Sequence, residues 1–296
     1  MISSLSEMYS FPFMQYALAV GVLGGGMLAF LGVFVHLRRI VFLGAALPQV
    51  VALGIAVAVF VSLPPLAGAV AGGALGVFVL SLLSRNDRLP RDGWIGLAYA
   101  AGSSVAVVLV SLSPAPDGTV LRFFTGDVLG TGRMDVLYTI AVLVPVAIIF
   151  FLFFWKRFVM CGFDPSTARA LGIRVNLWDA LLFIFLALAL SIVMNTAGGM
   201  LAFSMLIGPP AAALLLFRSF KLIIPAAVIF GVLAAFGGLT TSFMLDTPGG
   251  PTMGAAALAT AAIAWIIRTV STVCIKNQRC RKKSAAAAQG RGGESG

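Results

Sequence analysis

Very few side chains in the long apolar stretches of this sequence could do chemistry. In FLGAALPQVVALGIA, residues 42–56, the imide Pro48 and the amide Gln49 stand where the chain is otherwise uniformly apolar. Gln15 and Asn195 are the other strongly polar residues in such stretches, whose interiors hold no Asp, Glu, Lys or His. An amide oxygen can contact a hard cation or accept a hydrogen bond, but it is a poorer zinc ligand than imidazole. The pattern raises the question of what the protein moves or holds at this point.

The same residues exclude several classes of membrane protein. Ion-coupled carriers place ionisable relay residues inside their spans. Membrane metalloproteases need a paired-histidine motif, and ATPases need a GxxxxGK[ST] phosphate loop. The single histidine, His36, stands beside Arg38 and Arg39, where we expect an interfacial position, and no phosphate loop occurs. We therefore expect that the chain is not an enzyme and binds no cofactor. Any energy for uphill transport would come from a partner.

Composition predicts the fold class. The 296 residues are 60% hydrophobic and only 10% charged, with a mean hydropathy of +1.06, whereas a soluble domain is roughly a quarter charged. We predict an all-α, polytopic membrane bundle of eight or nine spans. The count stays open because the third segment is short and the sixth and seventh are nearly fused. The predicted segments are 14–35, 41–62, 66–83, 94–113, 136–155, 179–197, 199–217, 222–244 and 252–270.

Basic residues predict the orientation, because they gather in cytoplasmic loops. With the N-terminus outside and nine spans, 18 of the 20 Lys and Arg residues fall on the cytoplasmic side, and only Arg122 and Arg133 lie outside. The net charge of +10 then needs no nucleic-acid partner. We predict an extracytoplasmic segment 1–13, a transmembrane domain 14–270, and a basic, disordered cytoplasmic tail 271–296.

The longest basic loop inside the bundle, 156–178, carries its own helix signals. Asp164 suits an N-cap and Pro165 the first helical position, while Gly172 suits the helix end. A short capped helix held between two spans can transmit a push from a soluble protein. An amphipathic connector lying on the membrane explains the same pattern equally well.

A resemblance decides between these two readings. FDPSTARALGIRVNLWDALL, which begins in this loop and covers residues 163–182, resembles the cytoplasmic coupling segment of the zinc, manganese and iron permeases of ATP-binding-cassette (ABC) importers. MQYALAVGVLGGGMLAFLGVFVHLRRIVFLGAAL at 14–47, AGGMLAFSMLIGPPAAALLL at 197–216 and LDTPGGPTMG at 245–254 agree with the same family in order and spacing. The similarity extends over residues 14–270.

The resemblance implies a metal permease that dimerises in a bacterial inner membrane. Each copy would sit on a cytosolic ATPase, which uses ATP and Mg²⁺. An extracytoplasmic binding protein would deliver the metal to the outer mouth. The residues that match the family's coupling motif are Phe163, Asp164, Pro165, Ala168, Ala170 and Gly172.

The sequence departs from the family where the metal ligands are expected. Family members resemble G-D-A-L-S-H-A at this point, with Asp and His four residues apart on one helix face. Here Ala45 replaces the Asp and Gln49 replaces the His. The scaffold is kept while these two ligands are not, so the metal ligands of this chain are unknown.

Three explanations remain open: weak coordination of a metal, a different cargo such as a metal chelate or a small polar solute, or ligands supplied by a second permease chain. A non-transporting scaffold or receptor on a permease fold is the alternative from another class. Gln49 fits a hydrogen bond at a dimer seam as well as it fits cargo contact, and Met205 is more typical of core packing. The candidate translocation-path residues are Gln49, Ser204, Met205, Pro209 and Pro210.

Overall fold

The computed structural model describes residues 11–83, 90–113, 126, 128–163 and 165–291, and within these ranges its elements are all helices. The all-α prediction is therefore confirmed. The helices are α2 (Pro12–Leu37), α3 (Val41–Phe60), α4 (Pro65–Leu83), α5 (Arg91–Ser111), η1 (Val128–Gly130), α7 (Arg133–Ile149), the π-helical η2 (Phe150–Phe154), α8 (Trp155–Phe163), α9 (Pro165–Ala170), α10 (Val175–Ala197), α11 (Gly199–Leu216), α12 (Phe220–Met244) and α13 (Gly249–Arg291).

Eight helical stretches in the described part of the chain are long and apolar enough to cross a membrane. α4, with a shorter apolar stretch at Pro65–Val79, corresponds to the third predicted segment. The sixth and seventh segments are separate helices, because Gly198 adopts φ 86° between α10 and α11. This left-handed backbone suits glycine, which has no Cβ to clash.

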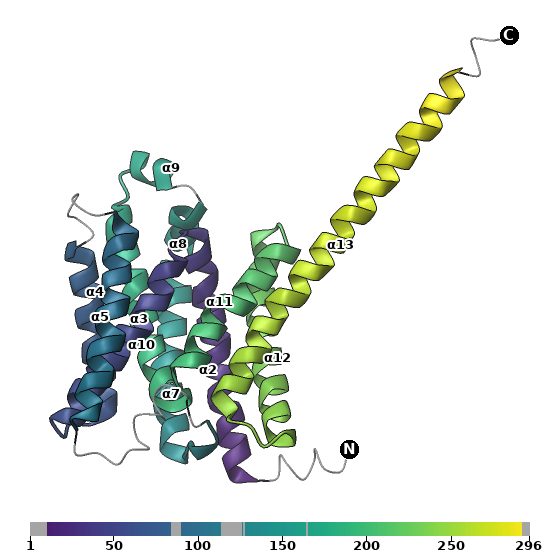
Figure 1. The fold of residues 1–296 in the computed structure, drawn as a ribbon. Coiled ribbons are helices and arrows are strands. Elements are labelled where there is room, and N and C mark those ends of the chain that lie inside the picture. The colour runs from purple at the N-terminus through teal and green to yellow at the C-terminus, as the bar shows by residue number, and fades with distance from the viewer. Residues whose placement is uncertain (1–10, 84–89, 114–125, 127, 164, 292–296) are drawn as a thin grey trace.

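The bundle has two distinct ends (Figure 1). α9 and the C-terminal half of α13 extend from one end, while α2 begins at the other. The prediction of a disordered tail from residue 271 was wrong, since α13 continues to Arg291. The stretch KNQRCRKKSAAAAQ is rich in Lys, Arg, Gln and Ala, which favour helix, and it contains no Gly or Pro. The predicted segment 1–13 lies almost wholly outside the described residues, and which end faces the cytoplasm stays a prediction.

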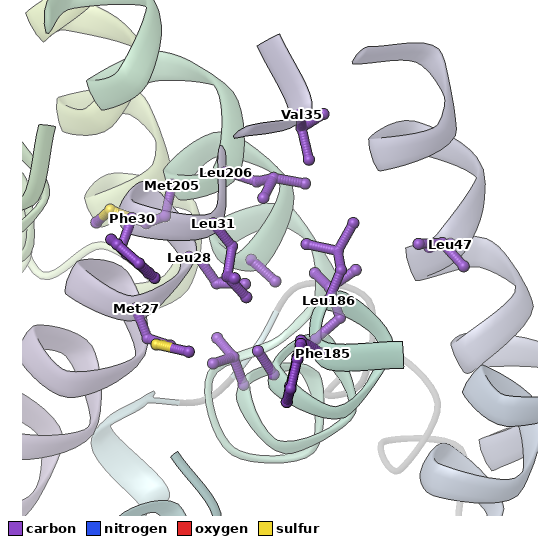
Figure 2. Packing of buried hydrophobic residues seen from close by; sticks show 14 of the residues in the cluster. Met27, Leu28, Phe30, Leu31, Val35, Leu47, Phe185, Leu186, Met205 and Leu206 are labelled. Atoms are coloured by element: carbon purple, nitrogen blue, oxygen red, sulfur yellow. The ribbon is translucent and has the colours of Figure 1, made fainter. Parts of the chain in front are cut away.

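The core is formed around α2, whose residues from Gly24 to Val35 are all buried. Figure 2 shows Leu28 and Leu31 of α2 gathered with Leu186 of α10 and Leu206 of α11. Glycines let the helices approach closely, as is typical of membrane bundles. A methyl group on Gly72 of α4, for example, would lie only 2.7 Å from the Cα atom of Gly54 in α3.

Candidate functional site

The helix α9, to which the resemblance assigns the coupling role, has the local structure that the sequence predicts. It begins at Pro165 and ends at Ala170. Its end is a Schellman turn, in which the Gly172 N–H donates to the Arg169 carbonyl and the Ile173 N–H to the Ala168 carbonyl, each at 3.0 Å. Gly172 has φ 79°, the left-handed conformation this turn requires. Asp164, the predicted N-cap, lies outside the described residues.

The described faces of α9 differ in exposure. Ala168 is fully buried and belongs to the hydrophobic core. Ala170 is exposed, and so is Leu171, whose side chain is 64% accessible at the tip of the turn. An exposed leucine beside a short buried anchor is suited to contact with another protein. Phe163 and Pro165 lie at the end of α8 and the start of α9.

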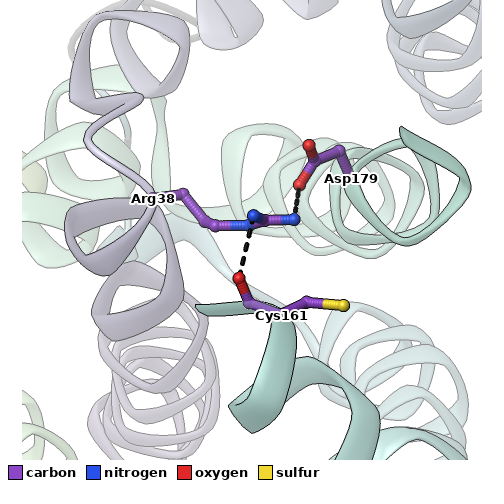
Figure 3. Close-up of polar contacts among 3 residues, drawn as sticks. All are labelled: Arg38, Cys161 and Asp179. Carbon is purple, nitrogen blue, oxygen red and sulfur yellow. Dashed lines mark hydrogen bonds and ion pairs between the residues drawn. The ribbon is translucent and has the colours of Figure 1, made fainter. Parts of the chain in front are cut away.

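An arginine that the sequence analysis did not assign to the site lies beside this segment (Figure 3). Arg38, at the C-terminal end of α2, donates one guanidinium N–H to the Cys161 carbonyl of α8 at 2.9 Å. Its other terminal nitrogen forms an ion pair with the Asp179 carboxylate of α10. The Arg38 side chain is only 11% exposed and the Asp179 side chain only 19%. A sequence signal did exist: Arg38 and Asp179 each stand at a span edge.

Aromatic side chains pack between α2, α8 and α10 at the same end of the bundle. Phe150 is fully buried and stacks on Phe158 with ring centroids 4.6 Å apart. Trp178 meets Phe158 edge to face at 5.4 Å, and the Arg157 guanidinium lies 5.3 Å above the Trp178 ring. These contacts join α8 to α10 beneath α9.

The two positions where the family ligands were expected share one face of α3. Ala45 and Gln49 are both partly exposed, although the residues between them, 46–48, are buried. α3 runs through Pro48 without ending. Because proline has no N–H, the Gly44 carbonyl receives no bond from the residue four positions on. This part of α3 therefore carries an amide side chain and a helix carbonyl that lacks its usual i+4 donor.

The other path candidates lie in α11 and are buried. Ser204 is 9% exposed and Met205 fully buried, and Pro209 and Pro210 are buried as well. The Ser204 hydroxyl lies against Gly254 of α13, and the Met205 sulfur lies against Gly25 of α2. In this single chain they pack between helices.

α3 and α11 nevertheless meet near these positions. A methyl group on Gly44 would lie 2.9 Å from a Leu206 side-chain carbon. Pro209 and Pro210 remove the intrahelical donors of the Met205 and Leu206 carbonyls, as Pro48 does for Gly44. Backbone carbonyls freed in this way can contact ions or polar cargo inside a membrane protein. Among the described residues no three His, Cys, Asp or Glu side chains gather into a metal site.

Comparison with known proteins identifies the family. Residues 10–269 match the model of the ABC 3 transport family. The chain belongs to this family. Members are membrane-spanning permease subunits of ABC importers, and a separate subunit hydrolyses ATP. The resemblance noted from the coupling segment is therefore confirmed.

Relatives within the family carry names that refer to metals. The chain is similar to the manganese transport system membrane protein MntC of Halalkalibacterium halodurans, with 29% identity over 82% of this chain and 83% of the relative. It is 28% identical to the chelated iron transport system membrane protein YfeC of Yersinia pestis, over 83% of each chain. The solved structure of PsaBC from Streptococcus pneumoniae in complex with Fab superimposes with a TM-score of 0.81 at 25% identity, covering 90% of this chain and 95% of that one.

This ABC 3 family permease is thus a multi-pass membrane protein, and a bacterial inner membrane fits it. Manganese and iron appear in the relatives' names. Zinc, which the sequence resemblance also implied, stays a prediction.

Proposed function

We propose that this permease imports iron or manganese held in a complex with a small chelator. The observation that carries the proposal is the partly exposed face of α3, where Ala45 and Gln49 stand at the positions of the family's Asp and His. A bare transition metal needs imidazole or carboxylate ligands to replace its water. A complexed metal keeps its own ligands and needs only hydrogen-bond partners.

The groups near this face suit such a cargo. The Gln49 amide both donates and accepts hydrogen bonds, and the Gly44 carbonyl of α3, which lacks its i+4 donor, can accept one. The relative named for chelated iron supports the same cargo class. Weak coordination of bare manganese by the Gln49 oxygen is the second candidate, favoured by the relative named for manganese.

The remaining partners follow from the fold and the family. A cytosolic ATPase, which would use ATP and Mg²⁺, would receive α9 through the exposed Ala170 and Leu171. A second permease chain would complete the path along α3. An extracytoplasmic binding protein would dock at the opposite end of the bundle, near residues 246–251. The permease itself would bind no cofactor.

The test is uptake by the permease reconstituted in lipid vesicles with its ATPase and binding protein. Radioactive iron and manganese would be offered free and as citrate complexes. We expect the natural chain to import a complexed metal and Gln49→Leu to reduce that uptake about 5- to 10-fold, the effect of losing one hydrogen bond.

The Ala45→Asp, Gln49→His double variant restores the two family residues and serves as the matched comparison. We expect it to gain uptake of the free metal. Uptake of free manganese by the natural chain at the rate of the double variant would contradict the complexed cargo and favour direct coordination. Uptake of neither form by the natural chain, with uptake by the double variant, would refute iron and manganese as the cargo.

A further inference from the structure

The short connection between α2 and α3 is tied to the coupling segment through Arg38. α2 ends in a tight turn: the Arg39 N–H donates to the His36 carbonyl at 3.0 Å, and the Ile40 N–H to the Val35 carbonyl at 3.1 Å. Arg39 adopts φ 56°, and α3 begins two residues later at Val41. A displacement of Arg38 would thus pass directly into the start of α3.

Arg38 contacts the coupling segment on both sides. Cys161 lies near the end of α8, before α9, and Asp179 lies in the second turn of α10, after α9. The two partners therefore bracket residues 162–178 in the sequence, which include the whole of α9. Both bonds involve a charged donor in a place that water hardly reaches, which makes them stronger than neutral surface hydrogen bonds.

α8 and α10 do not depend on Arg38 to be held together. Phe158 packs on Trp178, and Arg157 lies over the same ring. α9 packs against α8 and α10, so aromatic and cation–π contacts already join the base of the coupling segment. Phe34 of α2 also meets Phe158 edge to face at 6.2 Å. Arg38 adds a polar connection from this base that starts at the α2–α3 turn itself.

We infer that Arg38 is a positioning residue that makes the α2–α3 turn move together with the coupling segment. A push received on Ala170 and Leu171 would then shift the start of α3, and with it the face that carries Ala45 and Gln49. The inference deepens the proposed function and rests on it for the identity of the push and the cargo. The mechanical connection itself can be measured without either.

The first experiment is hydrogen exchange on the permease alone, in lipid nanodiscs. Arg38→Ala is expected to speed amide exchange about 10-fold or more in two places, residues 38–43 and residues 165–173, since each loses its tie to the other. Arg39→Ala is the matched control. It removes the same charge one residue away, from an exposed side chain, and should leave exchange in 165–173 unchanged.

The second experiment tests whether Arg38 transmits movement between the two places or only stabilises the fold. Arg38→Ala alone leaves the Asp179 carboxylate without this arginine, so a second variant, Arg38→Ala with Asp179→Asn, removes the charge from both sides. We expect this double variant to fold, to keep ATP hydrolysis by the assembled importer, and to move about 10-fold less cargo per ATP hydrolysed. Arg38→Lys, which cannot span both partners with a planar fork, should be intermediate.

Three results would overturn the inference: unchanged exchange in Arg38→Ala, faster exchange confined to one of the two places, or a double variant with a normal ratio of cargo to ATP. Failure of the proposed function looks different. An unmodified importer that moves no metal would refute the cargo, while the exchange measurement on the permease alone would still decide whether Arg38 connects the two places.

Discussion

Gly102 of α5 offers a sharp test of how closely α3 must be held. It is buried, and it lies against the backbone of Gln49. A methyl group added there would stand 2.9 Å from both the carbonyl carbon and the carbonyl oxygen of Gln49, and 3.1 Å from the Val50 nitrogen. These are backbone atoms, which cannot rotate away as the end of a side chain can. Gly102→Ala should therefore push α3 and α5 apart at Gln49.

The size of the effect follows from two opposing terms. Alanine in place of a helical glycine favours the helix by about 1 kcal/mol. Overpacking a filled interior costs about 1–3 kcal/mol. Gly96 lies on the same helix, and an added methyl group meets nothing within 4 Å there. Gly96→Ala gains the same helix propensity but suffers no overpacking. The difference in unfolding free energy between the two variants therefore measures the overpacking at Gly102, which we expect to be about 1–3 kcal/mol.

The assay is unfolding of the two variants and the natural chain in the same lipid or detergent, together with uptake by the reconstituted importer. We expect Gly96→Ala to match or exceed the natural chain in both measurements. Gly102→Ala should unfold more easily and take up less cargo. Equal stability and equal uptake in the two variants would refute the close approach of α5 to the Gln49 backbone.

Three further predictions follow from the coupling end. Leucine at the fully buried Ala168 should abolish uptake, while the amount of protein recovered in the membrane fraction stays normal. A β-branched residue at Gly172, which has φ 79°, should also lower uptake. Unchanged uptake in both variants would contradict the coupling assignment. Phe150→Ala should lower the unfolding free energy by about 3–5 kcal/mol. Phe153→Ala, at a side chain that is 73% exposed, should change it by less than about 1 kcal/mol. Similar losses in the two variants would show that Phe150 is not a core residue. Burial raises the pKa of the Cys161 thiol; the Arg38 charge opposes this rise and the Asp179 charge adds to it. In a variant without the other cysteines, alkylation of Cys161 should therefore reach half its maximal rate at a higher pH than alkylation of free cysteine does. A half-maximal pH equal to or below that of free cysteine would contradict this.

The sequence was sufficient for those features that depend on neighbours along the chain. Apolar stretches of span length indicate the membrane helices whatever they pack against. The coupling helix was predictable because Pro165 fixes its start and Gly172 its end through local backbone geometry. The extended tail helix was missed because its charge was weighed more heavily than its helix-forming residues.

Features that depend on distant residues could not be predicted. Arg38 and Asp179 are 141 positions apart, and nothing in either neighbourhood specifies the other. The faces of the spans were equally hidden, because a helix that is apolar on all sides has no periodic pattern to indicate its buried side. Ser204 and Met205 therefore could be named as path candidates, although in the single chain they pack against α13 and α2.

The arrangement suggests why the coupling contact is electrostatic and the rest of the path is not. Deep in the membrane an ion pair is costly, so the helices that would move the cargo are held by glycine contacts, such as Gly72 against Gly54, which allow close approach. At the membrane boundary that cost falls, and a guanidinium can bond two partners in different directions at once. Arg38 stands at this boundary between three helices. If the inference about Arg38 holds, a contact there directs a displacement from α8 and α10 into α3.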